Sequence, residues 1–145
     1  MNPRRAPRTD AGSATVEAVI GVPVFLLLVS LAVFGGRLAI THQAVQSAAN
    51  DAARAASLAR TAPAARQAAE RSAAASLSNQ QIDCRTTGVT VDTRGFQVAV
   101  GVPAAVHVTV SCAVPLDSYG FPGAPDTRLV TATMSSPLDT FRARG

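Results

Sequence analysis

The chain contains one long apolar segment without a charged residue. It follows Glu17, ends before Arg37 and reads AVIGVPVFLLLVSLAVFGG. Its length approaches the roughly 20 residues that a helix needs to cross a bilayer and exceeds the ~7–15 apolar residues of a secretory signal. Gly21 and Pro23 interrupt the run, but membrane helices tolerate both residue types. We therefore predict a membrane-spanning helix over residues 13–36, with a fully buried core helix as the alternative.

The charges on either side of this segment predict its orientation. Arg4, Arg5 and Arg8 precede it against the single Asp10, whereas the other side is nearly neutral from Arg37 to Asp51. Positive residues favour the cytoplasmic side of a membrane. Residues 1–12 are therefore predicted to form a disordered cytoplasmic leader, and everything after Arg37 is predicted to be extracytoplasmic.

The positive net charge gives no sign of nucleic-acid binding. The formal net charge is +4, every basic residue outside the two histidines is arginine, and aromatic residues make up 4% of the chain. A nucleic-acid surface needs clustered positive charge interleaved with stacking rings, and these arginines are scattered. We expect a solvated outer surface and no nucleic-acid partner.

An alanine-rich region, residues 37–78, is predicted to form helices outside the membrane. The stretch from Gln43 to Arg60 contains no glycine or proline and is dominated by alanine, the strongest helix former. Its alanines recur about every four residues, so small side chains line one side of the helix. Pro63 marks a break, and Thr61 is a plausible N-cap for a second helix over about Ala64–Leu77.

The last region, residues 79–145, changes to a two-residue alternation that is typical of strands. Residues 88–92 alternate briefly. Residues 96–102 and 106–112 alternate around Pro103 and Ala104, which predicts a hairpin with its turn at these two residues. Residues 114–125 are rich in proline and glycine and are expected to form a loop, and residues 129–135 are expected to form a last strand. Helices followed by strands predict an α+β fold with a small antiparallel sheet.

Two cysteines, Cys84 and Cys112, lie on the side predicted to be exported. An even number of cysteines in an oxidising compartment predicts a disulfide. Closing a loop of about 30 residues would stabilise a small domain by roughly 3–4 kcal/mol in the chain-entropy model. Neither cysteine has a nearby histidine or cysteine at the spacing of zinc ligands, so no metal site is expected.

The sequence offers little support for catalysis. Its two histidines, His42 and His107, lie on different predicted elements, and solvated or capping roles fit them better than catalytic ones. No nucleophile elbow, phosphate-binding glycine loop or HExxH motif is present. We therefore expect a protein that is not an enzyme and that uses no cofactor.

Glu17 is the residue that composition leaves unexplained. A carboxylate at the start of an apolar helix carries a desolvation cost of about 1–3 kcal/mol unless something compensates for it. The helix dipole favours a negative charge near a helix N-terminus. A cut after Gly12 would place the new amino group of Ser13 about one helical turn away, in the same or a neighbouring subunit.

The segment from Gly12 to Glu17, followed by the apolar run, resembles the class III signal of type IV pilin-like proteins. In that signal a prepilin peptidase cuts after a glycine and a glutamate is the fifth residue of the mature chain; with Ser13 as the first, Glu17 is the fifth. The alanine-rich helix, the cysteine pair and the late β-rich region resemble the TadE-like pseudopilins of the tight-adherence (Flp pilus) system. Ala18 departs from the pattern, because Phe or Tyr usually follows the glutamate.

The resemblance implies a minor pilin-like subunit that is processed by the prepilin peptidase between Gly12 and Ser13. Its expected partners are that peptidase, other pilin-like subunits, the pilus assembly machinery and the lipid bilayer. Glu17 would serve assembly by pairing with the mature amino terminus. The alternative is an uncleaved single-pass membrane protein whose extracytoplasmic domain binds a ligand or partner.

Overall fold

The computed structural model describes residues 11–116 and 126–143, with side chains from Glu17 onward. The predicted leader therefore lies almost entirely outside the described residues, as does most of the loop expected over residues 114–125. Contacts divide the chain into two compact units, Met1–Leu38 and Ala39–Gly145. Each unit is described by itself.

Helix α1, Ala11–Ser57, carries the whole apolar segment. Pro23 lies inside this helix, where it removes one backbone donor. The hydroxyl of Ser30 is satisfied within the helix, because it donates to the Leu26 carbonyl at 2.8 Å. The helix forms in spite of Gly21 and Pro23, as the sequence predicts.

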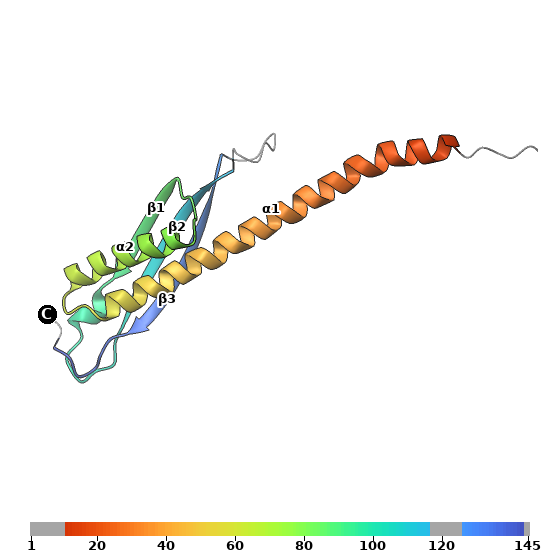
Figure 1. Cartoon of the computed structure of the whole chain (residues 1–145). Helices are drawn as coiled ribbons and strands as arrows, with labels where there is room; N and C mark the ends of the chain where they lie inside the picture. The colour runs from red at the N-terminus through yellow and green to blue at the C-terminus, as the bar shows by residue number, and fades with distance from the viewer. Residues whose placement is uncertain (1–10, 117–125, 144–145) are drawn as a thin grey trace, which may run out of the picture. The chain divides into compact units, whose positions relative to one another are not determined.

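In the second unit, the remainder of α1 and helix α2, Ala62–Asn79, lie over one face of a small sheet (Figure 1). Thr61 caps α2 as predicted, since its side-chain oxygen accepts from the Ala64 N–H at 3.3 Å. Both helices bury small side chains, and those that are fully buried are Ala48, Ala49, Ala52, Ala53, Ala56, Ala65, Ala69 and Ala73.

The sheet has three antiparallel strands in the order β1-β2-β3: Thr86–Asp92, Ala105–Pro115 and Thr127–Pro137. The face under the helices is apolar, with Val106, Val108, Val110 and Cys112 of the central strand fully buried. The opposite face carries hydroxyl groups, and those of Thr109 and Thr133 lie 2.8 Å apart across neighbouring strands. The predicted α+β class is thereby confirmed.

One predicted strand is wrong. Residues 96–102 alternate in sequence, but the chain forms the short 3₁₀ helix η1, Arg94–Gln97, followed by a loop. The backbone N–H of Arg94 donates to the Asp92 carboxylate at 3.0 Å, which turns the chain out of β1. Gly95 then packs so closely on the Ala105 carbonyl that a Cβ would clash with it, and Gly101 adopts a φ of 92°. The hairpin partner of β2 is therefore β1.

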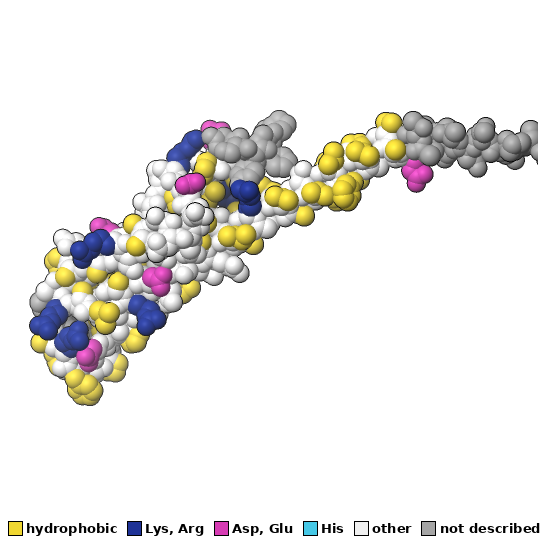
Figure 2. All heavy atoms as spheres, viewed as in Figure 1, with side chains coloured by type: hydrophobic (Ala, Val, Ile, Leu, Met, Phe, Trp, Pro, Cys, Tyr) yellow, Lys and Arg dark blue, Asp and Glu magenta, His cyan; other side chains and the backbone are white. Residues whose placement is uncertain are grey.

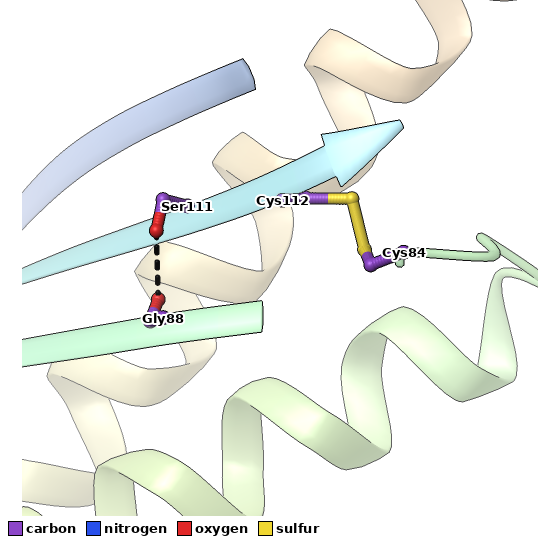
Figure 3. Close-up of a disulfide and its surroundings, with 4 residues drawn as sticks. All are labelled: Cys84, Gly88, Ser111 and Cys112. Carbon is purple, nitrogen blue, oxygen red and sulfur yellow. Dashed lines mark hydrogen bonds between the residues drawn. A yellow bond between two sulfur atoms is a disulfide. The ribbon is translucent and has the colours of Figure 1, made fainter. Parts of the chain in front are cut away.

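The predicted disulfide joins Cys84, just before β1, to Cys112 on the covered face of β2 (Figure 3). Beside it, the Ser111 hydroxyl donates to the Gly88 carbonyl at 3.4 Å. A Cβ at Gly88 would lie only 2.6 Å from that hydroxyl oxygen, so glycine leaves room for this contact. The bridge fixes the chain between α2 and the sheet.

Candidate functional site: the apolar part of helix α1

In the first unit, every residue of the apolar run of α1 is exposed except Phe34, which is half-buried. Hydrophobic side chains line it in Figure 2, and the exposed fractions include 69% for Val19, 65% for Phe25 and 65% for Leu27. Burial of such side chains is favourable, because each one gains about 1.5–3 kcal/mol on leaving water. This surface therefore needs lipid or neighbouring protein around it.

Among the described residues, α1 is the one helix that is long and apolar enough to cross a membrane. It lies near the N-terminus, and none of the side chains in its most apolar stretch is buried. A helix of 18 residues is about 27 Å long, close to the thickness of the hydrocarbon core. This part of α1 fits a single-pass membrane anchor.

Glu17 is an exposed residue at the beginning of the apolar surface. It borders a shallow groove of about 440 Å³, together with Ala18, Gly21, Val22 and Phe25. A Cβ at Gly21 would meet no atom within 4 Å, so the glycine leaves an open notch one helical turn after the carboxylate. The described residues provide no ion pair for Glu17.

Gly12 and Ser13 lie in the helical backbone at the start of α1, which begins at Ala11. The expected cut between them thus falls in the first turn of the helix. Glu17 follows Ser13 by four residues, or about 6 Å along the axis of an α-helix. The sequence spacing and the helical backbone together place Glu17 one turn beyond the expected new terminus.

Residues 12–54 match the family model described as TadE-like protein. The N-terminal segment is TadE-like. This match confirms the predicted resemblance and supports a pilin-like protein that is associated with the Tad/Flp pilus. The TadE-like family is structural rather than enzymatic. A match to this family implies interaction with pilus subunits and assembly machinery. Comparisons with curated proteins and with solved structures found no match.

The TadE-like segment extends beyond the apolar run into the alanine-rich part of α1, where it meets α2. There the Ser76 hydroxyl of α2 donates to the Asp51 carboxylate of α1 at 2.8 Å, and the Gln80 amide donates to Ser76. These residues line an open groove of about 620 Å³ between the two helices. This network could not be predicted from the sequence, because which residues of the two helices meet depends on how the helices pack.

The two histidines lie on different elements. His42 is exposed on α1, and His107 is exposed on the hydroxyl-bearing face of β2. Within residues 11–116 and 126–143, no three residues among His, Cys, Asp and Glu gather in a way that could hold a metal ion. The described part of the chain therefore offers α1 as its strongest candidate site.

Proposed function

We propose that this chain is a minor pilin-like subunit of a Flp-type pilus assembly system, cut by the prepilin peptidase between Gly12 and Ser13. The observation that carries the proposal is the family match, which begins at Gly12 and covers Glu17 and the whole apolar segment. The exposed apolar surface of α1 supports it as well, since this surface needs partners. The mature chain would be anchored with its second unit outside the cytoplasm.

In this proposal Glu17 pairs with the amino group of Ser13 in a neighbouring subunit. An unpaired carboxylate at the edge of a bilayer is costly, and an ammonium partner offsets that cost. The open notch at Gly21 leaves space beside Glu17 for the backbone of that neighbour. Pairing between subunits would then favour assembly and set the axial register of adjacent helices.

The chain contains no lysine, so its α-amino group is its only primary amine. A carbodiimide couples carboxylates directly to amines, and between two copies of this chain it can act only through an N-terminus. We expect treatment of native membranes to give a covalent adduct between Ser13 of one subunit and Glu17 of another, identified by mass spectrometry of the linked peptide. Glu17→Gln should lower the yield at least tenfold.

Glu70→Gln is the matched control, because Glu70 is an exposed carboxylate on α2 outside the apolar segment. It should leave the adduct unchanged. An adduct that persists in Glu17→Gln would contradict the pairing. The alternative, an uncleaved membrane-anchored binding protein, predicts that any adduct starts from Met1.

A further inference from the structure

Strand β3 forms one edge of the sheet, and its pairing with β2 shows which backbone groups it leaves free. The pairing is antiparallel and continuous over eleven residue pairs, from Thr127 opposite Pro115 to Pro137 opposite Ala105. Just beyond its ends, Leu116 donates to the Asp126 carbonyl and Leu138 to the Ala104 carbonyl, each at 2.9 Å. In an antiparallel pair, hydrogen-bonded residue pairs alternate with non-bonded ones. The even-numbered residues of β3 therefore bond to β2.

The odd-numbered residues of β3 consequently direct their N–H and C=O groups away from the sheet. These residues are Leu129, Thr131, Thr133 and Ser135, and all four are exposed. Nothing in the described part of the chain hydrogen-bonds to their backbone groups. Spaced two residues apart along a strand, such groups match the backbone of another extended chain.

This edge also lacks the features that usually prevent pairing with another chain. Natural proteins block exposed edges with charges, proline, bulges or very short strands. Between Arg128 and Pro137 the strand has no charge, no proline and no glycine, and its register contains no bulge. The opposite edge strand, β1, has only seven residues and contains Gly88 and Asp92. The β3 edge is thus open to strand addition.

We propose that the β3 edge binds an extended segment of another pilus subunit, uncharged except for a carboxylate at one end, which adds to the sheet as a fourth strand. The proposal rests on the proposed function for the presence of such a neighbour. Arg128, the second residue of β3, is exposed and has no acidic partner among the described residues. The bound segment would therefore carry a carboxylate at the end that meets Arg128, while its uncharged residues face the threonines.

The test places a photo-crosslinking amino acid at Leu129 of the full chain in native membranes. We expect a covalent adduct with a peptide of a different subunit, identified by mass spectrometry and containing an uncharged run next to Asp or Glu. Thr131→Pro removes one outward N–H and should lower the adduct at least tenfold, because proline is tolerated at such edge positions but cannot donate. Thr131→Val keeps the N–H and should leave the adduct unchanged.

Thiol labelling under non-reducing conditions checks that the bridge between Cys84 and Cys112 forms in each variant, and circular dichroism checks folding. If the proline variant fails either check, Thr131→Lys replaces it, because lysine blocks edges through its charge. Equal adduct in the proline and valine variants would overturn the proposal. So would an adduct with lipid or a second copy of this chain, or one no stronger than from a probe at Glu70. If Ser13 is the N-terminus in the same samples, the proposed processing survives that failure.

Discussion

At the scale of single residues, the roles of the carboxylates of Asp92 and Glu17 follow from their surroundings. Asp92 ends β1 beside Arg94, whose guanidinium and backbone N–H both donate to it at 3.0 Å. Glu17 has no ion pair in the described residues and begins an exposed apolar surface. The first carboxylate is satisfied within its own loop, whereas the proposed function gives the second one a partner in another subunit.

The pair of Asp92 and Arg94 makes the stability of the fold depend on pH. The hydrogen bonds from Arg94, first from its side chain and then from its backbone, lower the pKa of Asp92 from 3.8 to about 2. A lowered pKa in the folded state stabilises the fold above the unfolded pKa, and this stabilisation is lost as the pH falls from about 4 to 2. We expect Asp92→Asn to lower the Tm slightly at pH 7 and not at pH 2.

Thermal unfolding of the full chain in detergent, measured by circular dichroism at several pH values, checks this dependence. The matched control is Asp126→Asn, an exposed carboxylate without an ion pair in the described residues. It should show little change at any pH. A Tm difference for Asp92→Asn that stays constant down to pH 2 would show that the carboxylate charge is not responsible.

At the scale of elements, the helices of the second unit are held by closely packed alanines. Ala48, Ala52 and Ala56 of α1 and Ala65 and Ala69 of α2 are fully buried. Small side chains let helices approach closely, but each one buries little apolar area. The packing therefore depends on close fit, and enlarging a single side chain should disturb it.

We expect Ala52→Leu to lower the free energy of unfolding by about 1–3 kcal/mol, because the buried site has no room for the added carbons. Ala74→Leu is the matched control, since Ala74 is exposed on α2 and the same substitution should change stability by less than about 0.5 kcal/mol there. Denaturant unfolding of both variants in detergent measures the difference. Equal losses would mean that burial does not set the cost.

Most elements could be predicted from sequence because their signals are local. The alanine run, the Thr61 cap and the alternation in β2 and β3 each depend on neighbouring residues. The strand expected over residues 96–102 failed because its alternation competes with a tertiary contact, the packing of Gly95 on Ala105. A single sequence does not show which glycine is held against another segment.

The same distinction separates the two proposed interaction sites. Glu17 could be singled out from sequence, because a charge beside an uncharged apolar run is unusual wherever the chain folds. The free edge of β3 could not, since the direction of each backbone N–H depends on which residues pair with β2. A shift of one residue would exchange the inward and outward groups.

At the scale of the whole molecule, the chain joins an apolar anchor helix to a small unit that holds a disulfide. The anchor presents an exposed apolar surface, and the second unit presents a free strand edge. Both features are unsatisfied in a single subunit, for different physical reasons: one exposes apolar area and the other leaves backbone donors and acceptors unpaired. A subunit of a larger assembly would have both satisfied by its neighbours.

The most direct test of the account is the identity of the N-terminal residue in protein extracted from native membranes. The chain lacks lysine, so an amine-specific label attaches only at the α-amino group, and peptide mass spectrometry then identifies the labelled residue. We expect a label on Ser13 and an intact mass that is lower by the mass of the first twelve residues. A label on Met1, in cells with an active prepilin peptidase, would contradict it.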